Sequence, residues 1–261
     1  MQLSSVVPAG RLALHWYGQN SYAVKSPGGV LILVDPYFPH ERPAAQFIHP
    51  QPPVEEADLA LDAVLLTHDH GDHAHPETLR RIADSNSQTL FIGPADVAQS
   101  MIKDRIVGED RFATVVAGGQ HRVGDLSIYA VYTKPPAGDP ASGISVDPAI
   151  HLGYVIACAS VRLFITGDCI RTFVELDELV EPVKALAPQI GLITTHPTEG
   201  EFPLFAGSLE MARRLGLRIA FPSHYDCFVD RTFDPREWAA YFEGSGIEAR
   251  IMAYNSCVYV P

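Results

Sequence analysis

Imidazole and carboxylate side chains crowd into one short stretch of the sequence. It reads Thr67-His68-Asp69-His70-Gly71-Asp72-His73. These two side-chain types together are the ligand mix that Zn, Mn and Fe accept in proteins. The apolar run 63–66 comes directly before the cluster and is typical of a buried strand, so the side chains can converge where that strand ends. We therefore predict a metal site rather than an exposed histidine-rich loop, with ligands His68, His70, Asp72 and His73.

Two further candidate ligands follow apolar runs later in the chain. Asp168 comes after the run 163–166 and a glycine, and His224 comes after Phe221-Pro222-Ser223. An aspartate in such a place can bridge two cations, although a turn-capping role is also open to it. His224 has the alternative of being a histidine at the edge of the core. Four ligands fill little more than one metal, so these two residues favour a second.

Other polar residues suit substrate contact. His196 also follows a predicted strand, and it is equally suited to donating to a developing oxyanion and to a plain loop hydrogen bond. Tyr225, beside His224, is a candidate substrate contact with core packing as its alternative. Lys134 and Arg171 are candidates for meeting an anionic group, with solvated surface charge as the default.

Short apolar runs alternate with helical patterns along most of the chain. Residues 39–58 are rich in proline and predict a surface loop that is a candidate lid, and residues 133–149 predict a second long loop. No linker separates parts of the chain, which predicts one domain over residues 1–261. Strands are predicted at 12–17, 22–25, 30–34, 63–66, 89–92, 113–116, 126–132, 152–157, 161–166, 190–194, 218–221, 247–252 and 257–260, and helices at 75–83, 94–103, 172–187, 202–215 and 235–243.

Composition narrows the classes of partner. The 261 residues carry 19 Lys+Arg against 31 Asp+Glu, a formal net charge of −12, which disfavours a nucleic-acid partner. No apolar stretch reaches 18 residues, and the first residues lack the basic flank and apolar core of a secretory signal, so neither a membrane span nor export is predicted. Four cysteines without a CxxC pair favour reduced thiols and a cytoplasmic location.

The order of these motifs resembles the metallo-β-lactamase fold superfamily. The matching features are the cluster at 67–73, then Thr166-Gly167-Asp168, then the late Pro222-Ser223-His224, and they extend over nearly the whole chain. The openings Trp16-Tyr17-Gly18-Gln19-Asn20-Ser21 and Ile32-Leu33-Val34-Asp35-Pro36-Tyr37 look like the branch that contains L-ascorbate-6-phosphate lactonase. The resemblance implies an α+β fold, a four-layer αββα sandwich with the site along one edge of the two sheets.

The resemblance also implies how the ligands divide between two divalent cations, Zn or Mn, with Fe less favoured. His68 and His70 would hold the first cation. Asp72, His73 and His224 would hold the second, and Asp168 would bridge the two. The first cation usually takes one more histidine. Here the position after the strand 126–132 reads Thr133-Lys134-Pro135, so His151 is the better candidate and His121 the runner-up.

The expected activity is hydrolysis of a small ester or lactone by a metal-activated hydroxide, with a sugar-phosphate lactone as one candidate and Asp72 as the catalytic residue that orients the hydroxide and accepts its proton. The expected partner is a small, anionic molecule, and the closing strand could pair between subunits of a homo-oligomer. A phosphodiesterase or nuclease, a thioesterase, a di-iron oxidoreductase and a non-catalytic, metal-stabilised binding protein are the alternatives, because one fold supports many functions.

Overall fold

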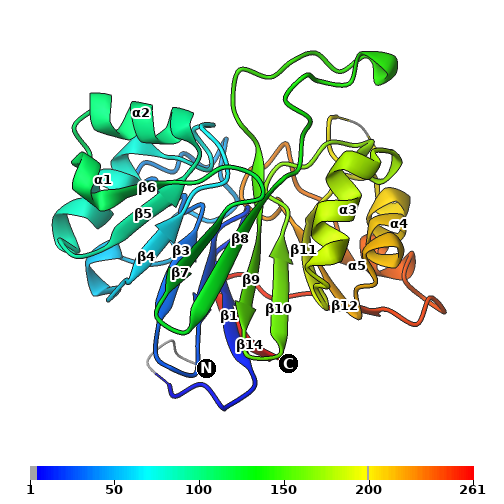
Figure 1. Cartoon of the computed structure of the whole chain (residues 1–261), viewed down its shortest axis with the longest axis horizontal. Helices are drawn as coiled ribbons and strands as arrows, with labels where there is room; N and C mark the ends of the chain where they lie inside the picture. Colours follow the sequence, from blue (N-terminus) through cyan, green and yellow to red (C-terminus); the bar gives the residue numbers. More distant parts are fainter. Residues whose placement is uncertain (1–4, 199) are drawn as a thin grey trace.

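Two seven-stranded sheets face each other in the computed structural model, which describes residues 5–198 and 200–261 (Figure 1). The first sheet has the order β14 (Ser256–Val260), β1 (Leu12–Trp16), β2 (Tyr22–Lys25), β3 (Leu31–Val34), β4 (Ala63–Leu65), β5 (Leu90–Gly93) and β6 (Phe112–Thr114). The second has the order β13 (Glu248–Ala249), β12 (Ile219–Ser223), β11 (Ile190–Thr194), β10 (Val161–Ile165), β9 (Leu152–Cys158), β8 (Leu126–Tyr132) and β7 (Gln120–Val123).

Helices cover the outer face of each sheet (Figure 1). The first sheet is covered by α1 (Pro76–Ser85) and α2 (Ala95–Lys103), and the second by α3 (Asp177–Ala185), α4 (Phe205–Leu215) and α5 (Pro235–Ala240). Short 3-10 turns lie at Glu56–Asp58, Glu109–Arg111, Pro140–Ser142 and Phe173–Glu175. The predicted αββα sandwich is therefore confirmed.

Three apolar layers account for this arrangement. Alternate residues of β1 and β10, such as Leu14 and Leu163, point into the layer between the sheets. Residues of the opposite face, such as Phe164, pack under α3 and α4, and Phe91 packs under α1 and α2. Each sheet is thus apolar on both faces, which fits the nearly unbroken apolar runs of its central strands.

The parallel strands place their carboxyl ends at one edge of the sandwich. In the first sheet β3, β4, β5 and β6 are mutually parallel neighbours, and in the second β10, β11, β12 and β13 are. The candidate residues predicted at strand ends follow these strands directly, so both sheets deliver them to the same edge, where ligands of open α/β sheets commonly bind.

Two long loops border this edge. The loop between β8 and β9 rises well above the sheets in Figure 1, and it carries the 3-10 turn at Pro140–Ser142. The predicted loop 39–58 is joined to the chain after β12, because Ile48 N–H donates to Cys227 O and Val229 N–H to Gln46 O. Its role as a lid stays a prediction.

Several predicted elements differ from the structure. The helix predicted at 172–187 is divided into a 3-10 turn and α3, because Leu176 adopts an extended conformation between them. The strand predicted at 247–252 shrinks to the two residues of β13, and the short strand β7 was not predicted. The residues of β7 alternate between exposed and half-buried positions, so the sequence there has little apolar pattern. Within the described residues, no helix is long and apolar enough to span a membrane.

Candidate metal centre

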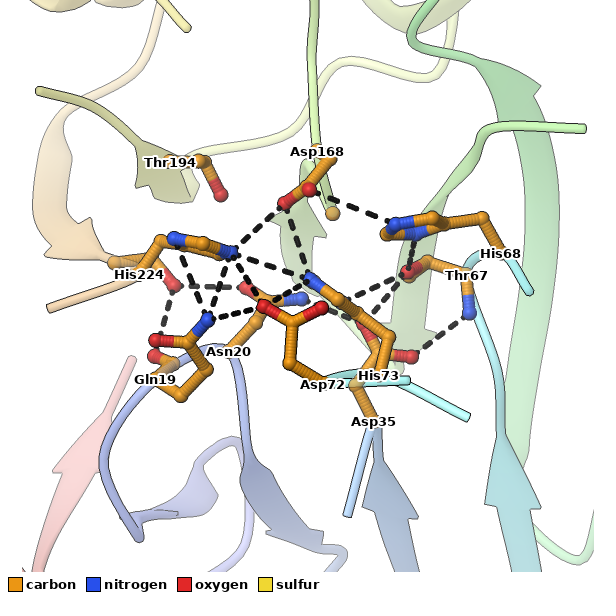
Figure 2. Close-up of polar contacts among 12 residues, drawn as sticks. Gln19, Asn20, Asp35, Thr67, His68, Asp72, His73, Asp168, Thr194 and His224 are labelled. Carbon is orange, nitrogen blue, oxygen red and sulfur yellow. Dashed lines mark hydrogen bonds and ion pairs between the residues drawn. The ribbon is translucent and has the colours of Figure 1, made fainter. Parts of the chain in front are cut away.

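Asp168, which follows β10, lies between two histidines from different parts of the chain (Figure 2). Its Oδ1 atom is 3.2 Å from His73 Nε2 and 3.3 Å from His224 Nε2. Its Oδ2 atom is 3.5 Å from His68 Nε2. Asp72 completes this side of the site, with its Oδ2 atom 3.6 Å from His224 Nε2 and 4.0 Å from His73 Nε2. One carboxylate therefore contacts donors on both sides of the centre, as expected of a bridging ligand.

A group of three imidazoles forms the other side of the centre. His68 stacks on His151 with ring centroids 4.2 Å apart and meets His70 edge to face at 4.5 Å. One ligand atom from each of the three lies within 4.8 Å of the others. His121, the runner-up, lies on β7 and belongs to no comparable group among the described residues. The structure therefore favours His151 over His121.

Unsatisfied buried atoms show that this donor set fits a cation. His68 Nε2 and Asp168 Oδ1 are buried and make no hydrogen bond, although oppositely charged or polar groups lie within 3.5 Å of them. Leaving such groups unpaired costs free energy, so native structures avoid it unless a partner is missing. Buried imidazole and carboxylate atoms that make no hydrogen bond are ligand atoms that divalent metal ions accept.

Asp35 lies next to the centre and orients one of its histidines. It follows β3 with a left-handed φ of 43°, is fully buried, and accepts hydrogen bonds from Asn20 Nδ2 at 2.7 Å and from the Thr67 hydroxyl at 2.6 Å. Its Oδ2 atom is 2.7 Å from His73 Nδ1. This carboxylate fixes the ring of His73 so that Nε2 faces Asp168, which is the usual way a ligand histidine is oriented.

Gln19 contacts the second group of ligands. Its Nε2 atom donates to Asp72 Oδ2 at 2.8 Å and lies 2.8 Å from His224 Nε2 (Figure 2). Gln19 has a left-handed φ of 52°, and its N–H donates to Tyr225 O. Since His224 Nε2 cannot contact the amide and a cation at once, a cation here requires Gln19 to release that contact.

Electrostatics separate the histidines of the two groups. Burial lowers the pKa of His68 well below its ordinary value, and His73 adds to this effect. Burial lowers the pKa of His151 to about 4, with Lys134 acting in the same direction. Neutral imidazole is the form that binds a metal, so these two are ready to bind at neutral pH.

His73 and Asp168 behave as a charged pair. Burial alone would lower the pKa of His73, but Asp168, Asp35 and Asp72 together raise it well above its ordinary value. Burial would likewise raise the pKa of Asp168, but His73 and His224 hold it well below the ordinary range. Without a cation, a proton on His73 provides the positive charge that balances the nearby carboxylates on this side of the centre.

The centre lies at the floor of a cleft of about 530 Å³. His196, predicted at a strand end, lines this cleft, so the structure brings it to the site. The volume falls within the usual range of about 300–1,000 Å³ for small-molecule sites. The other lining residues are His70, Asp72, Lys134, Asp168, Gly200, Glu201, Phe202, Asp230 and Arg231.

Comparison with known proteins decides the family. Residues 31–225 match the family described as Beta-lactamase superfamily domain. The chain belongs to the metallo-β-lactamase superfamily. The match covers the strands and strand ends that carry the cluster at 67–73, Asp168 and His224.

Relatives of this superfamily protein cover most of its length. A UPF0173 metal-dependent hydrolase of Myxococcus xanthus is 26% identical over 227 residues, covering 84% of this chain and 72% of the relative. A UPF0173 metal-dependent hydrolase of Archaeoglobus fulgidus is 23% identical over 245 residues, covering 92% of this chain and 95% of the relative.

Solved structures share the fold at lower identity. The metallo hydrolase Igni18 of Ignicoccus hospitalis has a TM-score of 0.71 at 18% identity, covering 96% of this chain and 99% of that one. An isothiocyanate hydrolase from Delia radicum gut bacteria has a TM-score of 0.74 at 18% identity, covering 94% and 98%. These likenesses confirm the metallo-β-lactamase fold. The resemblance to the ascorbate lactonase branch stays a prediction.

One predicted site residue of this metallo-β-lactamase fold protein lies elsewhere. The Tyr225 ring is buried in the core between Trp16, at 4.6 Å, and Phe233, at 4.8 Å. It does not line the cleft, so the predicted substrate contact is corrected to core packing. The carbonyl of Tyr225 instead receives the Gln19 N–H described above.

The cations around the cleft also differ from expectation. Lys134 lines the cleft, but Asp147 at 2.9 Å and Glu201 at 2.6 Å neutralise it. Arg171 is exposed and does not line this cleft. Arg231, which the sequence did not single out, does line it and has no carboxylate partner within 4 Å among residues 5–198 and 200–261. It lies in a loop without periodicity, so no pattern marked it.

Proposed function

We propose that this protein is a metal-dependent hydrolase of a small ester or lactone that carries an anionic group. The observation that carries the proposal is the pair of ligand groups meeting at Asp168, on the floor of a cleft of small-molecule size. The relatives named as metal-dependent hydrolases support the same class of reaction. A sugar-phosphate lactone is our candidate substrate, because it combines a lactone ester with an anionic phosphate.

Two divalent cations held by these ligands would lower the pKa of a water molecule, so that a hydroxide nucleophile exists near neutral pH. Asp72 lines the cleft and is held by Gln19. We assign to its free carboxylate oxygen the task of orienting the nucleophile and accepting its proton. The hydroxide oxygen would bond to the carbonyl carbon of the substrate, the C–O bond to the leaving oxygen would break, and Asp72 would pass the accepted proton to that leaving oxygen.

His196 and Arg231 supply the contacts to substrate in this proposal. His196 is half-buried in the cleft wall and suits a hydrogen bond to the carbonyl oxygen as negative charge develops there. Arg231 suits the anionic group, because a guanidinium can hold a phosphate or carboxylate through two parallel hydrogen bonds. Lys134 is less suited, since two carboxylates already neutralise it.

The test is a substrate panel on protein loaded with Zn²⁺ or Mn²⁺. The panel contains neutral and phosphorylated lactones, a simple ester, a phosphodiester, a thioester, a β-lactam and, because a fold neighbour carries that name, an isothiocyanate. We expect the phosphorylated lactone to have the highest kcat/KM. Hydrolysis of the phosphodiester alone would contradict the proposal and favour the phosphodiesterase alternative.

Paired arginine variants test the anionic group. Arg231→Ala should raise KM for the phosphorylated lactone roughly 10- to 100-fold, the worth of one charge-assisted contact, and leave the neutral lactone nearly unaffected. Arg171→Ala removes an equal charge away from the cleft and should change neither. Equal effects of Arg231→Ala on both lactones would show that Arg231 does not recognise the anion.

A further inference from the structure

Asp147 lies beside the three-histidine group, four residues before His151 in the loop that leads into β9. Its Oδ2 atom is 2.8 Å from His151 Nε2, and its Oδ1 atom is 3.8 Å from His70 Nε2. It comes from the long loop between β8 and β9, which otherwise rises away from the sheets (Figure 1). Each of its oxygens therefore faces one histidine of the group that the first cation would occupy.

Several contacts hold this carboxylate in place. Lys134, which is 4% exposed, donates to Asp147 Oδ2 at 2.9 Å. The backbone N–H of Ala149 donates to Oδ1 at 2.9 Å. Lys134 is itself held from the far side by Glu201. The buried lysine and the backbone of the local turn therefore hold the Asp147 carboxylate beside the histidines. The proline, glycine and serine residues of this loop would not hold it there by themselves.

The histidines themselves have capacity for a ligand at this place. His68 Nε2 is buried and makes no hydrogen bond, and His151 Nε2 lies 2.8 Å from Asp147 Oδ2, a separation that two ligand atoms of one cation can have. Imidazole nitrogens and carboxylate oxygens are both ligands that Zn and Mn accept. We propose that Asp147 is a further protein ligand, beside the bridging Asp168, of the cation held by His68, His70 and His151.

This assignment divides the work between the two cations. With the bridging Asp168 counted, this cation would have five protein ligands and a filled set, whereas a catalytic cation keeps a position open. The open position would then belong to the cation held by Asp72, His73 and His224. The first cation would also fasten the loop 133–149 to the edge of the sandwich. The inference requires that the protein binds metal, and it does not depend on which substrate it hydrolyses.

Asp147→Asn and Glu201→Gln form a matched pair for the test. Both replace a carboxylate on the same lysine with an isosteric amide, but only Asp147 faces the histidines. The first readout is the affinity for the first equivalent of Zn²⁺, measured by chelator competition on the full chain. We expect Asp147→Asn to weaken it more than about 100-fold, beyond the 10–100-fold typical of a lost outer hydrogen-bond partner. Glu201→Gln should change it less than about three-fold.

Two further readouts separate a ligand from a neighbour. Loading with Co²⁺ should give a visible absorption spectrum whose intensity changes in Asp147→Asn and not in Glu201→Gln, because the spectrum reports the coordination of the ion. Hydrogen exchange of the loop 133–149 should slow on Zn²⁺ binding in the wild type and not in Asp147→Asn. Circular dichroism of the metal-free variants confirms that both fold.

Two outcomes would overturn the proposal. An unchanged Co²⁺ spectrum with a 10–100-fold loss of affinity would make Asp147 an outer partner of His151. An unchanged affinity and spectrum would leave it as a loop contact only. In either case the proposed hydrolase function stands, since the substrate panel measures that separately.

Discussion

Asp72 and Asp69 lie in the same cluster but have different surroundings. Asp72 lines the cleft near His73 and His224, whereas Asp69 accepts a hydrogen bond from Ser100 of α2 at 2.6 Å. The sequence pattern alone could identify the cluster. The sequence analysis had already assigned the ligand role to Asp72 and not to Asp69. The turn after β4 gives a physical reason for that choice, because it directs one carboxylate toward the cleft and the other toward α2.

Asp72→Ala should therefore lower kcat at saturating metal by about 10²–10⁴, the usual worth of a general base, while the melting temperature of the metal-free protein changes little because the side chain is partly exposed. Asp69→Ala serves as the control and should retain most of the wild-type kcat. A near-normal rate in Asp72→Ala with metal bound would reject the assigned role.

The raised pKa of His73 predicts a proton count. At pH 7 the metal-free ring is protonated, since its pKa lies well above its ordinary value, whereas His68 and His151 are already neutral. Binding of the second cation should therefore release about one proton from His73, and binding of the first should release none from His68 or His151. Calorimetry in two buffers of different ionisation enthalpy measures both values. Equal release in the two steps would contradict these assignments.

At the scale of elements, the strand ends were the predictable part of the site. The runs before His68, Asp168 and His224 are apolar on both faces, so their type and direction could be read from the sequence. Gln19, Asp147 and Arg231 could not be found, because each lies in a loop where no periodicity fixes direction. His151 was identified as a candidate through the strand that follows it, and Tyr225 was misplaced because its neighbour, His224, is a candidate ligand.

The turn after β10 depends on Gly167. Its φ is 56°, and a Cβ atom there would lie 2.8 Å from Thr67 Cβ and 3.0 Å from Leu152 O. Gly167→Ala should cost roughly 2–5 kcal/mol of unfolding free energy, because left-handed strain and overpacking add, and it should weaken metal binding by shifting Asp168.

Gly216→Ala is the matched control. Gly216 ends α4 with a φ of 71°, but a Cβ atom there meets nothing within 4 Å. Only the strain remains, so we expect a loss of about 1–2 kcal/mol and unchanged metal affinity. Urea unfolding of both metal-free variants checks the difference. Equal costs would show that the close approach to Thr67 does not matter.

At the scale of the whole molecule, the centre joins the two sheets. His68, Asp72 and His73 follow β4 of the first sheet, whereas His151 precedes β9 and Asp168 and His224 follow β10 and β12 of the second. Cations bound here would connect the halves of the sandwich. The predicted cytoplasmic location and a homo-oligomer paired through β14, an edge strand, stay predictions.

Removal of metal should therefore lower the stability of the whole fold. A ligand that binds only the folded state stabilises it by about 2.7 kcal/mol at 100 times its Kd. We expect chelation by EDTA to lower the melting temperature by several degrees, and added Zn²⁺ or Mn²⁺ to restore it. A melting temperature independent of metal would show that the cations do not connect the sheets.

Metal stoichiometry tests the central claim most directly, namely that distant histidines and aspartates meet around two divalent cations. Titration of the metal-free protein, with metal content measured after gel filtration, should give two cations per chain. His151→Ala and His224→Ala should each retain one, because each variant loses a ligand of a different cation. A chain that binds no cation, or that keeps both in the two variants, would contradict the account.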